Sequence, residues 1–290
     1  MTLLALLTTL VIAPCVPGPV AVASPALDTI VELRPGDRVV LRDLSGSVTV
    51  EAVDGDRMEV KTGRQSDEIG LRRTDGRVVI GTAGKGASER TVDVALRVPV
   101  WADLEIEGHH LDVSVRGMAG AITVGSVSGD VRVEGTSGPV RAWTMAGEIV
   151  AESTSGALYL SSHSDDVRVR AASGPVEAQS LAGDLFFEAL SSASVRGETQ
   201  AGDMIFTGDI VAGGRYHFFL HAGDARLELP RDLSARVRVS TFHGTFESDF
   251  PVRVSGFTSG RPFEFTVGEG GAEVRVEVFD GAIRLVRGNR

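Results

Sequence analysis

Cysteine is almost absent from this sequence, which holds a single one, Cys15, among 290 residues. One thiol cannot close a disulfide within the chain, so the sequence excludes the disulfide-stapled class of small secreted domains. Aromatic residues are also scarce, at 6%. Because aromatic side chains supply much of the buried area of globular cores, this scarcity predicts a thin core. Basic residues number 29 against 39 acidic ones, which argues against a nucleic-acid partner, since such binding depends on Lys and Arg neutralising phosphates.

Long hydrophobic runs are lacking as well. Residues 3–13 are mostly apolar but too short to cross a bilayer, and no later stretch reaches about 18 apolar residues. This run leads to Ala21-Val22-Ala23, an A-x-A cleavage site, so we interpret residues 1–23 as a secretory signal peptide. We therefore expect a secreted or cell-envelope protein with no transmembrane segment in its mature chain. Lipidation of Cys15 stays open, because the Val-Ile-Ala-Pro before it faintly resembles a lipobox.

Glycine, by contrast, is abundant, with 35 residues, and many of them mark a repeat. From residue 120 to 191 a nine-residue unit repeats eight times without insertion, and seven of the eight units begin with Gly. The third position is always aliphatic, the fifth always apolar, and the ninth always Ser or Ala. The same frame extends over residues 102–192. A fixed period of this kind is the signature of a solenoid, in which stacked units bury one another's apolar side.

Each unit predicts one short strand and one corner. Apolar positions 3 and 5 between polar neighbours are typical of a half-buried strand, and a small residue followed by Gly suits a tight turn. Alternate units carry an acid at position 2, so two kinds of unit alternate. The sequence therefore predicts an all-β, single-domain β-solenoid of the β-helix or β-roll kind over residues 24–290, with about 18 residues and two strands per coil. We expect positions 3, 5 and 8 to fill its core, and residues 274–286 to cover its open end.

The acids at position 2 form a series along one wall of the predicted solenoid: Asp112, Asp130, Glu148, Asp166 and Asp184. We expect Asp203 and Asp224 to extend it. Carboxylates stacked at strand spacing repel one another, so something must compensate for them. One interpretation is a ladder of calcium sites, because hard cations bind several oxygen ligands. The other, which we favour, is that each carboxylate accepts turn N–H groups and pairs with Arg132, Arg168 or Arg226. No further cofactor is expected.

The other class of unit carries a candidate recognition face on the opposite wall. Its outward side chains are Arg141, Trp143, Tyr159, Glu177 and Gln179. Trp143 and Tyr159 fall on adjacent coils, and an aromatic residue beside an Arg is typical of binding hot spots. Such a platform stacks on sugar rings or seats the side chain of a partner. Isolated surface aromatics are nevertheless common, so a purely structural role stays open.

No catalytic or metal-binding pattern is present. The sequence has no G-x-S-x-G elbow, no H-E-x-x-H and no phosphate loop. His109 and His163 occupy position 8, so we expect both to be buried rather than to bind a metal. The strongest location for carboxylate chemistry is Asp165 next to Asp166. However, Asp165 stands where other units have the corner glycine, and Asp tolerates positive φ, so geometry alone accounts for it.

Several segments, in their order along the chain, resemble the bacterial putative-adhesin family of β-strand-repeat proteins, a domain of unknown function. They are the repeated Ser-Gly-x-Val-x-Val corners, Gly-Asp-Ala-Arg-Leu-Glu-Leu-Pro at 223–230, Ser-Asp-Phe-Pro at 248–251, and Val-Phe-Asp-Gly-Ala-Ile-Arg-Leu at 278–285. The resemblance runs from about residue 37 onward. It implies an adhesin-like extracytoplasmic β-solenoid with no established enzymatic role.

These observations lead to one hypothesis and two alternatives. We expect a non-enzymatic extracytoplasmic β-solenoid, an adhesin or cell-envelope scaffold, that binds an envelope or extracellular partner or a glycan. The first alternative is a polysaccharide-active solenoid enzyme that uses the acidic face, and the second is a calcium-stabilised surface protein. An enzyme would gather acidic and basic side chains in one groove, whereas a scaffold would spread its features along the stack.

Overall fold

The computed structural model describes residues 28–63, 69–82, 91–252 and 262–288, and every regular element within these ranges is a β-strand. The expectation of an all-β fold is therefore confirmed. None of the described residues forms a helix long and apolar enough to cross a membrane. The predicted signal peptide and Cys15 lie outside the described residues.

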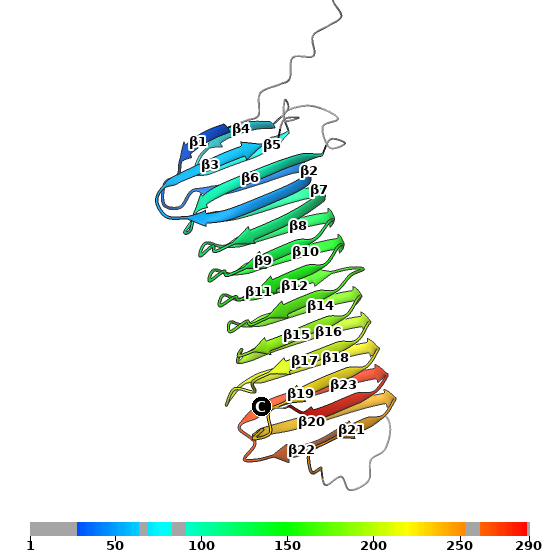
Figure 1. Cartoon of the computed structure of the whole chain (residues 1–290). Coiled ribbons are helices and arrows are strands. Elements are labelled where there is room, and N and C mark those ends of the chain that lie inside the picture. Colours follow the sequence, from blue (N-terminus) through cyan, green and yellow to red (C-terminus); the bar gives the residue numbers. More distant parts are fainter. Residues whose placement is uncertain (1–27, 64–68, 83–90, 253–261, 289–290) are drawn as a thin grey trace, which may run out of the picture.

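The strands stack along one long axis (Figure 1). In the middle of the chain each strand pairs in parallel with the second strand after it rather than with the next one. Val140 lies opposite Leu158 in this way, and both belong to what we call the even wall. The even wall there consists of β8 (Ile122–Ser128), β10 (Val140–Ala146), β12 (Leu158–Ser162) and β14 (Val176–Ala182). The odd wall consists of β9 (Val131–Glu134), β11 (Ile149–Glu152), β13 (Val167–Arg170) and β15 (Leu185–Leu190).

Both walls continue toward the C-terminus, where more residues separate successive strands of the same wall. The even wall adds β16 (Ser194–Ala201) and β18 (Arg215–Ala222), and the odd wall adds β17 (Met204–Gly208) and β19 (Ala225–Leu229). Between β16 and β18 the paired residues Val195 and Tyr216 are separated by longer corners than those of the regular repeat. The nine-residue frame is lost here because the even-wall strands stay in register across longer corners, and because the register of β15 with β17 shifts between Phe187 and Leu190.

Side chains directed between the walls form the core. Burial alternates along each strand, so that Leu158 and Leu160 of β12 are buried while Tyr159 between them is exposed. The core is aliphatic through most of the regular repeats and gains aromatic residues from the last repeat onward. Its aromatic part is a cluster of fully buried rings 5.3–6.0 Å apart: Phe187, Phe206, Tyr216 and Phe218. Each such side chain contributes about 1.5–3 kcal/mol through removal from water.

The prediction that position 8 lines the core is wrong for half of the units. In odd-wall units position 7 takes a left-handed φ, as at Ser153 (54°), and this turn directs position 8 inward, where Thr154 is buried. In even-wall units the strand continues through position 7, so Thr144 at that position is buried and position 8 projects outward. His109 and His163 are therefore exposed rather than buried.

At the N-terminal end two long strands, β2 (Arg38–Val53) and β7 (Asp103–Arg116), pair in parallel. On its other side β2 pairs with β5 (Arg77–Thr82) and β6 (Val92–Pro99). Two strands then pair antiparallel to the stack, β3 (Arg57–Thr62) with β6 and β4 (Ile69–Thr74) with β5, and β1 (Asp28–Glu32) pairs antiparallel with β3. The parallel ladder thus ends in antiparallel strand pairs at this end.

At the C-terminal end the expected order is wrong. The segment of residues 274–286 was expected to cover the open end, but its strands β23 (Ala272–Asp280) and β24 (Ile283–Arg287) lie one level further in, between β18 and β19 on one side and β20 (Ala235–His243) and β21 (Phe246–Ser248) on the other. The outer strand is β22 (Phe263–Val267), antiparallel to β20. Figure 1 shows this insertion. β22 therefore covers the outer edge of β20, and β22 itself is the edge strand of this wall.

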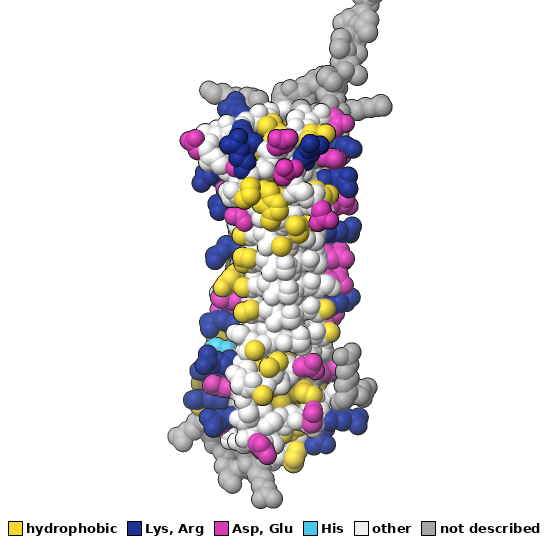
Figure 2. All heavy atoms as spheres, turned by 90° about the vertical axis from the view of Figure 1, so that its left-hand side faces the viewer, with side chains coloured by type: hydrophobic (Ala, Val, Ile, Leu, Met, Phe, Trp, Pro, Cys, Tyr) yellow, Lys and Arg dark blue, Asp and Glu magenta, His cyan; other side chains and the backbone are white. Residues whose placement is uncertain are grey.

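The edge seen in Figure 2 is the one where odd-wall strands turn into even-wall strands. Along the middle of the stack charged side chains gather at the two sides of this view, and the column between them carries few. The column corresponds to the glycine corners. At Gly156 a β-carbon would overlap the backbone carbonyl of Gly138 on the neighbouring coil. Close approach of successive corners, rather than φ, is what requires glycine there.

Candidate recognition face and acidic ladder

The five predicted recognition residues lie together on the even wall. Arg141, Tyr159 and Glu177 are opposite one another on β10, β12 and β14, and Trp143, Ser161 and Gln179 form the adjacent row. All five, with Ala142, Leu160 and Ser161, line one depression of about 210 Å³. The depression exists because Ser161 is small and stands between two larger side chains of its row.

Trp143 is held by a glycine on the preceding strand. Its indole occupies the space that a β-carbon at Gly125 would take, and Gly125 is buried beneath it. The two residues are register partners across β8 and β10. Trp143 nevertheless keeps 41% of its surface exposed. The glycine therefore lets the indole pack closely against the wall while its outer surface stays accessible.

Short-range contacts order the rest of the depression. The Arg141 guanidinium lies 5.1 Å from the centre of the Tyr159 ring, a cation–π geometry. The Gln179 side-chain amide donates to the Glu177 carboxylate at 3.3 Å. Tyr159 is 42% exposed. An aromatic ring, a cation and two polar groups thus converge within two adjacent rows.

A second depression, of about 350 Å³, continues the first toward the C-terminal end. Both are lined by Trp143, Ser161 and Gln179, and we call the two together the groove. The far end of the groove is Phe219 on β18, which is 38% exposed. Sequence reasoning did not include Phe219, because the nine-residue frame slips after residue 192 and hides its alignment with Trp143. Counting back from the Gly223 corner would have placed it in the same row.

The odd wall has a different surface, made of charged pairs that bridge neighbouring strands. Arg170 Nη2 lies 2.7 Å from a Glu188 carboxylate oxygen, and a hydrogen bond to that carboxylate raises the pKa of Arg170. Arg132 bridges to Glu152 at 2.9 Å. From β10 to β14 the even wall instead exposes aromatic, amide and hydroxyl groups beside Arg141 and Glu177, and its ion pairs, such as Arg196 with Glu198 on β16, lie further along the stack.

The acidic series forms a ladder of hydrogen bonds to the backbone. One carboxylate oxygen of Asp112 accepts the amide N–H of Asp130, eighteen residues on, at 2.9 Å. The same contact recurs along the series, in the pairs Asp130 with Glu148, Asp166 with Asp184, Asp184 with Asp203, Asp203 with Asp224, and Asp224 with Ala282. The expectation that these carboxylates accept N–H groups is confirmed for the aspartates, whose donors lie eighteen or more residues further on rather than in the residue's own turn, whereas the Glu148 carboxylate accepts from Arg168.

The expected arginine partners are correct in one case out of three. Arg168 contacts both Asp166, at 2.9 Å, and Glu148, and its hydrogen bond to Glu148 raises the pKa of Arg168. Arg132 and Arg226 instead pair with Glu residues of the odd wall. Within the described residues no group of three or more His, Cys, Asp or Glu side chains is placed to hold a metal.

Asp165 and Asp166 have separate structural roles. Asp165 accepts the Gly147 N–H of the preceding coil at 2.8 Å, whereas Asp166 accepts the Asp184 N–H of the following coil at 2.9 Å. Asp165 is not among the residues with positive φ, so the explanation by backbone geometry is wrong there. Its side chain adds a hydrogen bond to the corner that glycine could not make.

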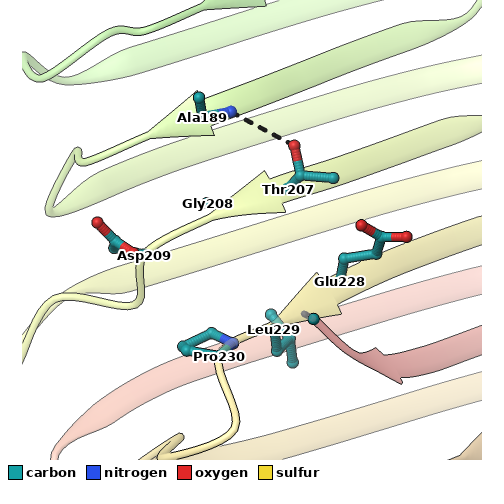
Figure 3. A pocket seen from close by; sticks show the side chains of 8 residues that line it. Ala189, Thr207, Gly208, Asp209, Glu228, Leu229 and Pro230 are labelled. Atoms are coloured by element: carbon teal, nitrogen blue, oxygen red, sulfur yellow. Dashed lines mark hydrogen bonds between the residues drawn. The ribbon is translucent and has the colours of Figure 1, made fainter. Parts of the chain in front are cut away.

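A corner cavity of about 300 Å³ lies on the odd wall near the C-terminal end, lined by Thr207, Asp209, Glu228 and Pro230 among others (Figure 3). The Ala189 N–H donates to Thr207 Oγ1 at 3.3 Å. The carboxylates of Asp209 and Glu228 point in different directions in Figure 3, and Glu228 pairs with Arg226. The cavity thus lacks the arrangement of a glycosidase, in which two carboxyl groups face a bond held between them.

Neither a protein-family model nor a curated protein matches the chain. Among solved structures, it is similar to a putative adhesin from Bacteroides fragilis, with 9% identity over 90% of this chain and 97% of that one, TM-score 0.40. It is also similar to a putative lipid binding protein from Parabacteroides distasonis, with 13% identity over 90% and 97%, TM-score 0.43. A putative cell adhesion protein from Clostridium sporogenes has 12% identity over 91% and 100%, TM-score 0.22.

Proposed function

We propose that this chain is an extracytoplasmic β-solenoid, with residues 24–290 forming one adhesin-like domain after removal of residues 1–23. In this proposal it is a non-enzymatic binding module of the cell envelope or cell surface. It binds an envelope or extracellular partner through the even wall. The observation that carries the proposal is that Arg141, Trp143, Tyr159, Glu177 and Gln179, chosen from the sequence, line a single depression.

The distribution of charge supports a binding role over a catalytic one. The aspartates of the acidic series, which the enzyme alternative needs, accept hydrogen bonds from the backbone, as Asp130 does from the Glu148 N–H, and the Glu148 carboxylate pairs with Arg168. The even wall meanwhile exposes Trp143 and Tyr159 at 41% and 42%. Exposed, well-seated aromatic side chains are the residues that dominate binding energy at interfaces.

The test is binding of the purified mature chain to whole cells and to isolated envelope fractions. We expect a double variant, Trp143→Ala with Tyr159→Ala, to lose about tenfold or more of the wild-type affinity. The matched control is Phe186→Ala, which removes a partly exposed aromatic ring from the odd wall, where Arg168 covers it at 4.1 Å. Equal binding by wild type and the double variant would refute the role of the even wall. Recovery of the native protein in the cytoplasmic fraction would refute the extracytoplasmic location.

A further inference from the structure

We propose that the groove binds a linear neutral polysaccharide, laid across the strands and parallel to the long axis of the stack. This inference rests on the proposed function and names the ligand class of the same wall. The groove follows one register row over five successive even-wall strands: Trp143, Ser161, Gln179, Glu198 and Phe219. At about 4.8 Å per strand, four steps separate the aromatic ends by about 19 Å.

The length and direction of the groove fit an extended polymer better than a compact ligand. The larger depression, of about 350 Å³, by itself runs from Trp143 to Phe219, and the smaller one, of about 210 Å³, adjoins it across the row of Trp143, Ser161 and Gln179. On one side the groove is bordered by the row just described, and on the other by His163, Leu181 and Gln200. A ligand that fills the groove therefore crosses several coils and contacts equivalent positions on each.

The chemistry of the lining matches a sugar chain. One face of a pyranose ring carries only C–H groups and packs on an exposed aromatic ring, here Trp143 at one end and Phe219 at the other. The lining between them supplies the amides of Gln179 and Gln200 and the hydroxyl of Ser161. Amides and hydroxyls both donate and accept, as the hydroxyl groups of a sugar also do.

The charge of the groove selects against anionic polymers. Its larger part contains no Lys or Arg among its lining residues, and its one carboxylate, Glu198, contacts Arg196. In its smaller part Arg141 lies over Tyr159. Recognition of uronate or phosphate polymers depends on cationic side chains directed at the ligand. The groove offers no such row, so a neutral polysaccharide fits it best.

An extended peptide fits less well. Peptides that bind sheets usually add a strand to an unpaired edge, because their backbone N–H and C=O groups need partners. Each even-wall strand from β10 to β16 is paired on both sides, so the groove floor has no strand edge to offer. The buried hydroxyl groups of the groove floor already donate to backbone carbonyls of the protein, as Ser180 does to Asp165 at 3.2 Å, so they do not serve as donors to a peptide backbone.

The experiment is affinity electrophoresis of the mature chain in gels that contain a neutral soluble polysaccharide (hydroxyethyl cellulose, mixed-linkage β-glucan, galactomannan or dextran) or an anionic one (polygalacturonate or alginate). We expect retardation by at least one neutral polymer and by neither anionic polymer. Trp143→Ala and Phe219→Ala should each reduce the affinity about tenfold, whereas Phe186→Ala on the odd wall should leave it unchanged. Unchanged circular dichroism and melting of each variant confirm that the wall is intact.

A further variant tests whether binding requires the Trp143 indole in its present position and not only a Trp at that residue. Gly125→Val keeps Trp143 but places a side chain where the indole now lies, so we expect a loss of affinity close to that of Trp143→Ala. Retardation by the anionic polymers alone, or by no polymer, would overturn the inference. Binding of neutral polymers that neither Trp143→Ala nor Phe219→Ala weakens would do the same. If cell binding still depends on Trp143 while all neutral polymers fail, this inference falls and the proposed function stands, and a peptide ligand becomes the favoured explanation.

Discussion

Asp130 offers a direct test of what the acidic ladder does. Its carboxylate accepts the Glu148 N–H at 2.9 Å, and within the described part of the chain it forms no ion pair. Replacing Asp130 with Ala removes the acceptor, whereas replacing it with Asn keeps an oxygen in the same place and removes only the charge. The two variants therefore separate hydrogen bonding to the backbone from charge.

The magnitude follows from the type of bond and its exposure. A hydrogen bond to a charged group contributes about 1.5–3 kcal/mol, and since Asp130 is exposed, water replaces part of it, which favours the lower end. We expect Asp130→Ala to lower the free energy of unfolding by about 1.5 kcal/mol, or about 3–6 °C in Tm for a chain of this size. Asp130→Asn should cost less than about 0.5 kcal/mol, because loss of the charge also relieves repulsion from the neighbouring acids.

Two assays read this out. Denaturant unfolding gives the free energy, and hydrogen exchange of the peptide that contains residue 148 reports on the amide that loses its acceptor. Local exchange matters because a stack of repeats can open in parts rather than all at once. We expect faster exchange at Glu148 in Asp130→Ala and nearly native exchange in Asp130→Asn, both measured with a metal chelator present.

Two results would refute this reasoning. Equal destabilisation by Asp130→Ala and Asp130→Asn in chelator would show that the charge, not the acceptor, stabilises the ladder. A wild-type Tm that rises with added calcium, and no longer rises in Asp130→Asn, would show that the series binds calcium and that the alternative of a calcium-stabilised surface protein is correct.

Two further predictions concern the core and the corners. The buried Tyr216 hydroxyl donates to the Ser192 carbonyl at 2.7 Å, and burial raises its pKa above the usual value. Tyr216→Phe should therefore cost about 1–2 kcal/mol near neutral pH. Because the pKa is raised in the folded state, the stability that Tyr216 adds is fully present below pH of about 10 and is lost as pH rises through the folded-state pKa. The free energies of unfolding of wild type and variant, measured by urea titration, should therefore converge at alkaline pH. A difference that stays constant with pH would contradict the role given to the Tyr216 hydroxyl. At the corners, Gly156→Ala should lower Tm clearly, because its β-carbon would meet a backbone carbonyl, whereas Gly63→Ala, whose β-carbon has its nearest neighbour at 3.9 Å, should not; equal Tm values for the two would contradict the close approach.

The sequence alone determined the strands and their faces in the regular repeats. Strict alternation, as around Leu158 and Leu160, leaves one face of a strand for the core, and a period of two fixes which residues that face carries. The recurrence of acids every eighteen residues also predicted the offset that the ladder bonds now have, as between Asp112 and Asp130. These features are local, and for that reason they can be read from spacing.

Only the tertiary structure decided the rest, because it depends on how corners turn and on contacts between segments far apart in the chain. A left-handed residue such as Ser153 turns position 8 of its odd-wall unit inward, whereas the even-wall units lack this turn, so His163 projects outward against expectation. The insertion of β23 between β18 and β20 leaves no periodic trace, since strands that pair across 58 residues carry no spacing signal. The place of Phe219 in the same groove as Trp143 was also hidden in the sequence. The corners between their strands differ in length, so their spacing is irregular, although the strand register aligns them.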